Sequence, residues 1–542
     1  MNDDASTVLR KYPRAVLALR GAFRDAQLGL MLGAGVSTAF DFNGTKPPSW
    51  KDLVDSLERT LGFDASDSAY QKLSMTQRVE ILFRSFLHRE EVDPTDPGAM
   101  AAAHGHWREL IREHLYKKAP PPEKLTSRHP FMSAMIKLVL QSPMTVTYNF
   151  DSFLEESLTT LPTAAKEGFT SKYRLPFESI SDVTLPQRRS SAIIYHINGY
   201  LPRNPVEVAS DHLVFSEGEF SSQLMMAMAG RYATVAHHLV NNVFLLIGLS
   251  VDDPNLRHQL RTNSIVSPGR VHFIVRHVKE AREPAELTEG ENGVAETGFD
   301  LYNLYSLYLT SREIGGLCKL IAMTASDFAE LATMAGIETK LVYYLSGIPG
   351  IGKTTILRHM GGLYALDEWV ETPHELLARP HNTLSEHQRG KLDQWIAGQF
   401  KLKNQVLREF HEGIFIVERG PLDPLAFESQ DRIPGKARSY GNWLDVEYQP
   451  LQGGQVVVLH GDTEIVQRRI SNRQSISQNS VYLNGLQGQL RKLYHVDGTI
   501  EWRSTEWSIE TLVRHFSSLV YNEPYGVVDL QNRLLALADQ RT

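Results

Sequence analysis

The chain has 542 residues, which predicts two to four domains, and its 42% hydrophobic and 22% charged residues are typical of a globular protein. The net charge of -7 gives no global basic field that would attract nucleic acid, so we expect no nucleic acid partner, and a local basic groove stays open. Cys318 is the single cysteine, which excludes an internal disulfide and a cysteine zinc cluster and fits a reducing compartment. The polar N-terminus does not resemble a signal peptide, and no apolar run could span a bilayer. We therefore expect a cytoplasmic protein without a membrane partner.

A buried strand is predicted at residues 28–32, where an apolar run ends in small residues. The loop that follows contains Gly33, Ala34, Gly35 and Ser37. Without Cβ atoms, backbone N–H groups can approach a pyrophosphate, and a following helix would add the positive end of its dipole. The dinucleotide fingerprint has a third glycine, which Ala39 and Phe40 replace here. A plain glycine turn after a core strand is the alternative.

Further buried strands are predicted at 144–148, 191–197, 243–247 and 271–275, and they alternate with helices. A helix opened by Ser49 and a mostly helical stretch over 65–118 are inserted after the first strand. Small or polar residues gather at the strand ends: Asn149, Asp151, His196, Asn198, Gly199, Gly248, Ser250 and Asn255. This pattern predicts a Rossmann-like parallel α/β sheet with its ligand at the carboxyl edge.

In this order these residues resemble the sirtuin-like NAD-binding family, in its bacterial defence-associated branch. The resemblance covers about residues 10–310 and includes Phe215-Ser216-Glu217. It implies that the Gly-Ala-Gly loop holds the NAD pyrophosphate and that Asn149 and Asp151 line the nicotinamide-ribose pocket. It also implies a histidine general base. A carboxylate, an amide and a base suit glycosidic cleavage, which passes through an oxocarbenium-like state.

Two departures from that family narrow the implied chemistry. The four-cysteine zinc module of ordinary sirtuins is absent, so the resemblance is to enzymes that hydrolyse NAD with water. Asn198 stands where sirtuins place the base histidine, and His196 lies two residues earlier on the same side of a strand. His196 as the base, a functional Asn198 without a histidine base, and an inactive site all stay open. Structural roles also stay open: a helix N-cap and a first-turn acid for Asn149 and Asp151, an N-cap for Ser250 and a core histidine for His196.

The middle of the chain predicts a boundary between two domains. Residues 279–299 are charged and turn-rich, which predicts a loop or surface insertion. We place a first domain at 1–311, a helical linker at 312–337 and a second domain at 338–542. The second domain is expected to be a P-loop kinase-like parallel α/β unit, with its last strand at 524–530.

The second domain opens with a strand at 341–345 that runs into a complete G-x-x-x-x-G-K-T motif. Backbone N–H groups of such a loop cradle the phosphates of ATP or another nucleoside triphosphate, its lysine reaches the β- and γ-phosphates, and its threonine supports Mg²⁺. The phosphate-binding residues predicted here are Gly347, Gly350, Gly352, Lys353, Thr354 and Thr355.

The remainder resembles the deoxynucleoside and nucleotide kinase family. The similar segments are 367–373, the helix 392–407 with Trp395, Gln399 and Asn404, the strand 414–417 with Glu418, Arg419 and Asp423, and 461–474. The resemblance implies Glu418 as an aid to Mg²⁺, Arg419 as a phosphate or base contact, and Glu371 as general base, with Glu368 as its competitor. Arg468, Arg469 and Arg473 are candidate phosphate clamps, because the guanidinium fork binds phosphate oxygens bidentately. Alternatively, Glu371 is a helix-start acid, the arginines form a solvated face, and Trp395 belongs to the core.

Together the two halves predict an NAD+ hydrolase that releases nicotinamide and acts as an antiphage abortive-infection effector. Nucleotide binding to, or turnover by, the kinase-like domain would gate it, since a ligand that favours one conformation shifts the population. We expect nucleotide ligands, a homo-oligomer and a phage-derived or nucleotide trigger. A nucleoside or nucleotide kinase with a non-catalytic N-terminal domain is one alternative, and a non-catalytic nucleotide-sensing scaffold is another. A protein deacylase is the least supported.

Overall fold

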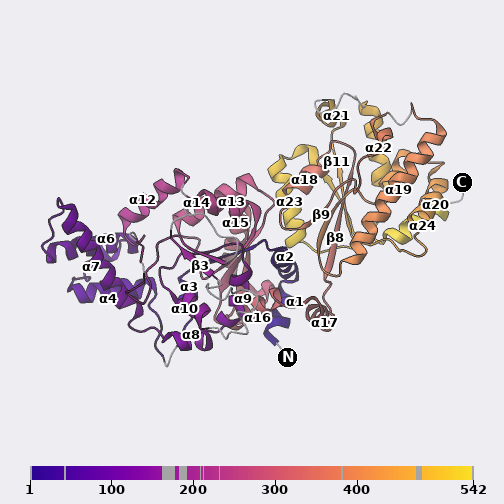
Figure 1. The fold of residues 1–542 in the computed structure, drawn as a ribbon. Coiled ribbons are helices and arrows are strands. Elements are labelled where there is room, and N and C mark those ends of the chain that lie inside the picture. The colour runs from indigo at the N-terminus through magenta and orange to yellow at the C-terminus, as the bar shows by residue number, and fades with distance from the viewer. Residues whose placement is uncertain are drawn as a thin grey trace. The chain divides into compact units, whose positions relative to one another are not determined.

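The computed structural model describes residues 3–41, 44–160, 177–181, 192–207, 209–210, 213–230, 232–379, 383–471 and 479–539. The chain divides into two compact units, each built on a parallel β-sheet flanked by helices (Figure 1). Unit 1 comprises Met1–Tyr12, Ala22–Val266 and Val271–Phe328, and unit 2 comprises Pro13–Gly21, Ser267–Arg270 and Ala329–Thr542. The predicted fold class, two α/β units with parallel sheets, is confirmed.

Unit 1 contains a seven-stranded sheet in the order β3-β4-β2-β1-β5-β6-β7, and its strand pairs are parallel. The strands are β1 (Leu28–Leu32), β2 (Thr145–Thr147), β3 (Phe177–Ile180), β4 (Ala192–His196), β5 (Val243–Ile247), β6 (His272–His277) and β7 (Leu304–Leu309). β1, β2, β4 and β5 are buried at every residue, which explains their continuous apolar sequences. The chain leaves β1 toward β2 on one side, whereas β5 pairs with β1 on the other. The carboxyl ends of β1 and β5 therefore mark a topological switch point, where such sheets bind ligands.

Helices cover both faces of this sheet and form an insertion between β1 and β2. The insertion packs in an apolar cluster that includes Leu57, Leu82 and Trp107, and Ser49 caps α4 as predicted, as part of a capping box. The helices of unit 1 are α1 (Asp3–Lys11), α3 (Ala34–Ser37), α4 (Trp50–Leu61), α5 (Ser68–Gln71), α6 (Met75–Arg89), α7 (Pro97–Tyr116), α8 (Pro122–Arg128), α9 (Met132–Gln141), α10 (Phe153–Thr159), α12 (Glu217–Met228), α13 (Ala233–Asn241), α14 (Pro254–Val266), η1 (Pro284–Glu286), α15 (Glu289–Tyr302) and α16 (Ser311–Ile321). Helix α2 (Pro13–Arg24) belongs to unit 2 over Pro13–Gly21 and to unit 1 from Ala22.

The prediction of a loop over residues 279–299 is wrong for its second part. Thr288 caps helix α15 by accepting from the backbone N–H of Glu291, whose side chain in turn accepts from Thr288. This capping box starts a helix in spite of its three glycines and high charge. The predicted linker 312–337 contains α16, in unit 1, and α17 (Ala325–Ala335), within which the boundary between the units falls after Phe328.

Unit 2 contains a five-stranded parallel sheet in the order β12-β11-β8-β10-β9. The strands are β8 (Lys340–Gly347), β9 (Tyr364–Leu366), β10 (Gly413–Glu418), β11 (Gln455–His460) and β12 (Thr499–Arg503). Its helices are α18 (Lys353–His359), η2 (Glu375–Ala378), α19 (Glu386–Glu409), η4 (Asp423–Phe427), α20 (Ile433–Leu444), α21 (Thr463–Ser471), α22 (Ser480–Leu493), η5 (Ser504–Glu506), α23 (Ile509–Tyr521) and α24 (Leu530–Asp539). The prediction of a last strand at 524–530 is wrong, because Val528 forms only an isolated antiparallel bridge with Gly454. Strand β12 lies at the edge of the sheet instead.

Candidate nucleotide-binding sites

The G-x-x-x-x-G-K-T motif forms a loop between the central strand β8 and helix α18 of unit 2. Gly350 and Gly352 have φ values of +74° and +124°, which glycine adopts far more readily than other residues. The ammonium group of Lys353 donates to the carbonyl oxygens of Gly347 and Ile348 at 2.9 and 3.0 Å. Burial, together with the neighbouring Arg419, lowers the pKa of Lys353 to about 8. A phosphate in this loop would therefore meet a desolvated cation.

A hydroxyl and a carboxylate lie together beside this loop. Oγ1 of Thr354, in the first turn of α18, donates to Oε1 of Glu418 at the end of β10, at 2.6 Å. Oδ2 of Asp423, a buried carboxylate near them, has no hydrogen-bond partner among the described residues. Mg²⁺ prefers oxygen ligands of these kinds and binds through one or two carboxylates and substrate phosphates. Thr354 and Glu418 thus fit the predicted Mg²⁺ site.

Arg419 connects two carboxylates in the same site. Its Nε donates to Glu368 at 2.5 Å, and its NH1 lies 3.6 Å from Oδ2 of Asp423. Oδ1 of Asp423 accepts hydrogen bonds from Ser346 and Tyr494, both at 2.8 Å. Arg419 is in the left-handed region, with φ of +69°. Such a conformation is uncommon outside glycine and is held here by the side-chain partners and by the N–H···O bond to Leu345.

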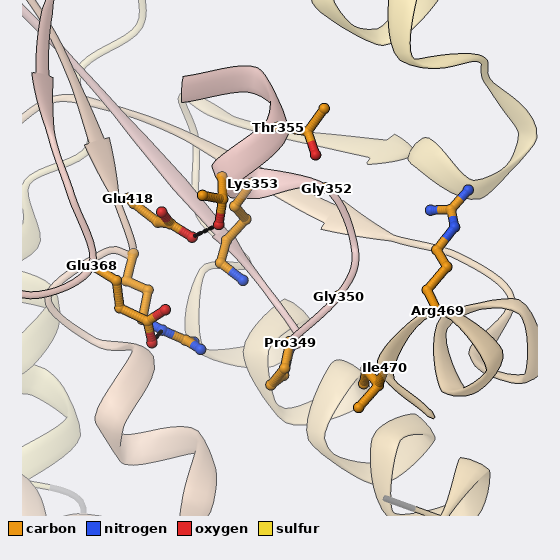
Figure 2. Close-up of a pocket in the computed structure, with 11 residues that line it drawn as sticks. Pro349, Gly350, Gly352, Lys353, Thr355, Glu368, Glu418, Arg469 and Ile470 are labelled. Carbon is orange, nitrogen blue, oxygen red and sulfur yellow. Dashed lines mark hydrogen bonds and ion pairs between the residues drawn. The ribbon is translucent and has the colours of Figure 1, made fainter. Parts of the chain in front are cut away.

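These side chains surround a cavity of about 200 Å³. Figure 2 shows Glu368 and Glu418 on one side of the P-loop and Arg469, from α21, on the other. The lining residues are Pro349, Gly350, Gly352, Lys353, Thr354, Thr355, Glu368, Glu418, Arg419, Arg469 and Ile470. The cavity brings together most of the residues that the sequence predicted for unit 2.

Some predicted residues of unit 2 lie elsewhere. Glu371 is exposed and does not line the cavity, and its carboxylate accepts from Nε2 of Gln399 at 2.7 Å, so Glu368 is the better placed acid. Arg468 does not line the cavity and 79% of its side chain is exposed, and Arg473 lies outside the described residues. Trp395 packs on Trp369 with ring centroids 5.1 Å apart.

Sequence reasoning missed Lys403, which is 2% exposed. Its Nζ donates to the carbonyl oxygen of Glu418 at 2.8 Å, and burial lowers its pKa to about 8. Lys403 lies one turn of α19 after Gln399, on the same helix face. This spacing from a residue already singled out is the sequence signal that could have identified Lys403.

In unit 1 the loops after β1 and β5 meet at the switch point with their backbones in contact. The N–H of Gly33 donates to Ile247 and that of Gly35 to Gly248, both at 3.0 Å. A Cβ atom on Gly33 would lie 2.4 Å from the Gly248 carbonyl oxygen, and one on Gly248 would lie 2.6 Å from the Val36 nitrogen. The glycines at these positions are thus needed for close backbone contact. Ala34 and Gly35 are exposed at the loop tip.

Asn149 joins the loop after β2 to the loop after β1. Its Nδ2 donates to the Gly33 carbonyl oxygen at 3.0 Å and to Oγ of Ser37 at 2.9 Å. Ser37 donates in turn to Oδ2 of Asp151 at 2.7 Å. Burial raises the pKa of Asp151 to about 6, in spite of the hydrogen bonds from Ser37 and from the Phe153 N–H. Ser37, predicted from the first loop, and Asn149 and Asp151, predicted from the segment after the second strand, form one hydrogen-bonded network.

His196 and Asn198 are both buried beneath this network. Nδ1 of His196 contacts the Asn149 carbonyl oxygen at 2.9 Å, and its Nε2 contacts Glu155 at 2.7 Å. Asn198 donates to the Tyr148 carbonyl oxygen at 3.0 Å and accepts from Gln223 at 3.0 Å. The side chains of His196 and Asn198, the two candidates for the base position, are thus both hydrogen-bonded to other groups of the protein.

Two further predicted residues lie on the β5 side. Ser250 is exposed, and its hydroxyl donates to Asp252 at 2.5 Å. Asn255 is 2% exposed in the first turn of α14, accepts from Gln259 at 3.1 Å, and its Nδ2 has no partner in the described part of the chain. Asn255 therefore keeps an unused donor close to the switch point.

Comparison with known proteins gives one family match, to a family described as "SIR2-like domain", over residues 143–293. This match indicates an NAD-related domain. It lies in the middle of the chain and does not support a sirtuin-like domain that begins at the N-terminus, as the range 1–311 assumed. Curated proteins give no match.

Solved structures give several matches of low similarity. Deoxyadenosine kinase from M. mycoides with bound dATP is 16% identical over 32% of this chain and 96% of that chain, with a TM-score of 0.27. A gluconokinase from Sinorhizobium meliloti 1021 is 16% identical over 37% and 94%, with a TM-score of 0.20. The NadR protein in complex with NAD and AMP-PNP is 9% identical over 72% and 91%, with a TM-score of 0.26.

Two features are absent from the described part of the chain. None of its helices is both long and apolar enough to cross a membrane. Among the same residues, no group of three or more His, Cys, Asp or Glu side chains is arranged to hold a metal ion.

Proposed function

We propose that unit 1 hydrolyses NAD+ at the β1–β5 switch point and that unit 2 binds a nucleoside triphosphate in its P-loop cavity. The observation that carries the first part is the hydrogen-bonded junction of three elements. Asn149 links the Gly33 loop to Ser37, and Ser37 links it to Asp151. The family match over residues 143–293 supports NAD as the ligand.

The chemistry assigned to unit 1 is cleavage of the bond between C1′ of the ribose and the nicotinamide nitrogen. The bonding electron pair leaves with nicotinamide, and water adds to C1′ of the oxocarbenium-like intermediate and loses a proton. Asp151 is our candidate to stabilise the positive charge and to take that proton, because a carboxyl with a pKa of about 6 is mainly ionised at pH 7 yet basic enough to accept it. Asn149 is the candidate contact for the ribose.

The proposed role of unit 2 is regulatory. NAD loss would harm the cell that makes the protein, so a hydrolase of this kind needs a gate, and a ligand that favours one conformation can supply it. We extend this proposal to antiphage defence, in which a nucleotide or phage-derived trigger releases the hydrolase and the host cell stops growing. Assembly into a homo-oligomer belongs to the same proposal.

Nicotinamide release tests the proposal directly. Purified protein is incubated with NAD alone and with each member of a panel of ribo- and deoxynucleoside triphosphates with Mg²⁺, and nicotinamide is followed by chromatography. We expect release that depends on at least one nucleotide and is lost in Asn149→Ala. No release under any of these conditions contradicts the proposal.

A second candidate function is a kinase with a non-catalytic unit 1. It is favoured by the P-loop cavity, which holds an acid, Glu368, close to the predicted phosphate site, and by the engaged side chains of His196 and Asn198. Under this alternative, ADP forms from ATP when a nucleoside or nucleoside monophosphate is added. Lys353→Ala abolishes the reaction, whereas Asn149→Ala leaves it unchanged.

A further inference from the structure

The hydrogen bonds of His196 restrict what its ring can do. A backbone carbonyl oxygen only accepts, so Nδ1, at 2.9 Å from the Asn149 oxygen, must carry a proton. Nε2 lies 2.7 Å from a carboxylate oxygen of Glu155 and shares a second proton with it. Neither nitrogen then has a lone pair directed at a substrate. A general base needs such a lone pair within hydrogen-bond reach of the proton it removes.

We propose that Glu155 and His196 form a positioning pair that holds the Asn149 loop, and that His196 is not the general base of the site. This inference rests on the NAD hydrolysis proposed above. Glu155 lies on α10 and His196 at the end of β4, so the pair fixes the loop after β2 from two sides. Nδ1–H holds the backbone of Asn149, while the side chain of Asn149 reaches Gly33 and Ser37.

The surroundings of the pair favour a charge-assisted contact. The side chains of His196 and Glu155 are 1% and 8% exposed, and Oε1 of Glu155 also accepts from Ser179 at 2.8 Å. A buried carboxylate is costly unless it is paired and hydrogen-bonded, which explains why an imidazole stands opposite Glu155. Oε2 of Glu155 has no hydrogen-bond partner among the residues the structure describes.

Asp151 and Tyr200 also lie close to the His196 ring. Burial lowers the pKa of His196, but Glu155, the Asn149 carbonyl oxygen and Asp151 together raise it, so that the net shift is upward. Tyr200 contacts the ring with a centroid distance of 4.5 Å. A doubly protonated ring at neutral pH agrees with the hydrogen-bond geometry, which is the basis of the proposal.

Positioning and base catalysis predict different kinetics. If the two residues form a positioning pair, Glu155→Gln and His196→Asn each weaken NAD binding about tenfold, as measured by calorimetry. The double variant binds NAD no more weakly than the more affected single variant, because the two residues act as a unit. The pH profile of nicotinamide release keeps its shape. Ser179→Ala, which removes only an outer contact, changes NAD affinity less than twofold.

A general base would give the opposite result. If His196→Asn leaves NAD affinity unchanged, lowers kcat more than a hundredfold and removes a limb of the pH profile, the proposal is wrong.

The protonation state of His196 is tested without activity, through the ¹⁵N-imidazole signal that disappears in His196→Asn. We expect both nitrogens protonated at pH 7 in wild type and a shift toward the neutral ring in Glu155→Gln; a wild-type ring that is neutral at pH 7 overturns the proposal. This spectroscopic result remains readable if wild type neither binds nor cleaves NAD, which would refute only the proposed function.

Discussion

Oγ1 of Thr354 donates a 2.6 Å hydrogen bond to the carboxylate of Glu418, which joins the start of α18 to the end of the neighbouring strand β10. Both groups are oxygen ligands of the type that Mg²⁺ prefers. We predict that Glu418→Gln lowers the affinity for ATP at least tenfold in the presence of Mg²⁺, because the glutamine carries no charge to attract the ion. The measurement is calorimetric titration of ATP with Mg²⁺ and with EDTA.

Glu464→Gln on α21, whose side chain is 73% exposed, serves as the control and should bind Mg²⁺-ATP as wild type does. An equal loss of affinity for Glu418→Gln in EDTA would count against a role in Mg²⁺ binding, since the effect would then be independent of the ion.

Lys353 gives a prediction on pH. Its pKa of about 8 means that the free loop loses its cation as the pH rises above 8, so triphosphate binding should weaken about tenfold from pH 7.5 to 9. Lys353→Arg should remove this dependence, since arginine stays protonated. Fluorescence titration with a labelled ATP analogue measures both. Lys401, a partly exposed lysine paired with Asp445, provides the control through Lys401→Ala. An affinity that stays flat across this range in wild type refutes the assignment.

Arg469 and Arg468 are neighbours on α21 with opposite environments. Arg469 lines the P-loop cavity, and the Arg468 side chain is 79% exposed. We predict that Arg469→Ala weakens triphosphate binding tenfold or more through the loss of charge-assisted hydrogen bonds, whereas Arg468→Ala changes it less than twofold. Competition binding with ATP, ADP and AMP locates the contact, since the loss should be largest for ATP. Equal effects of the two variants would mean that only the overall charge of the helix matters.

The sequence predicted best what depends on local patterns. The continuous apolar runs at 28–32 and 243–247 identified buried strands, and the complete motif from Gly347 to Thr354 identified the P-loop. Helix α15 was missed because its capping box at Thr288 is a two-residue signal within a charged segment. Local patterns carry little information on such a helix, whose surface is mostly polar.

The arrangement of the sites was harder to predict, because it depends on contacts between distant residues. The positions of Asn149 and Ser37 were predicted, but not the hydrogen bond between them, and His196 was weighed as a base without knowledge of Glu155, 41 residues before it. Glu368 and Glu371 are three residues apart, and sequence spacing could not decide which lines the cavity. Such choices are made by packing, which a single sequence does not reveal.

Gly248 allows a test of the switch-point junction. It has φ of +70°, and a Cβ atom there would lie 2.6 Å from the Val36 nitrogen. We predict that Gly248→Ala destabilises the protein by several kcal/mol or displaces the Gly33 loop, because the clash adds to the roughly 1–2 kcal/mol cost of a left-handed alanine. Gly230 has φ of +87° and open space around it, so Gly230→Ala should lose only the free energy that a left-handed alanine costs. Thermal unfolding compares the two, and equal losses would show that the backbone contact is unimportant.

Asp151 gives a prediction on stability against pH. Its folded-state pKa of about 6 is above the ordinary value of 3.8, so the folded protein holds this proton more tightly than the unfolded chain does. The resulting stabilisation is complete below pH 3.8 and is lost as the pH rises through 6. A shift of this size corresponds to about 3 kcal/mol. Relative to Asp151→Asn, which stays neutral, wild type should therefore lose most of this stabilisation, about 2.4 kcal/mol, between pH 4 and 7.5. Urea unfolding of both proteins at these two values measures the change, with Asp64→Asn at a fully exposed carboxyl as the control. A constant difference between wild type and Asp151→Asn would mean that Asp151 is already ionised at pH 4, and the base role assigned to it would lose its physical ground.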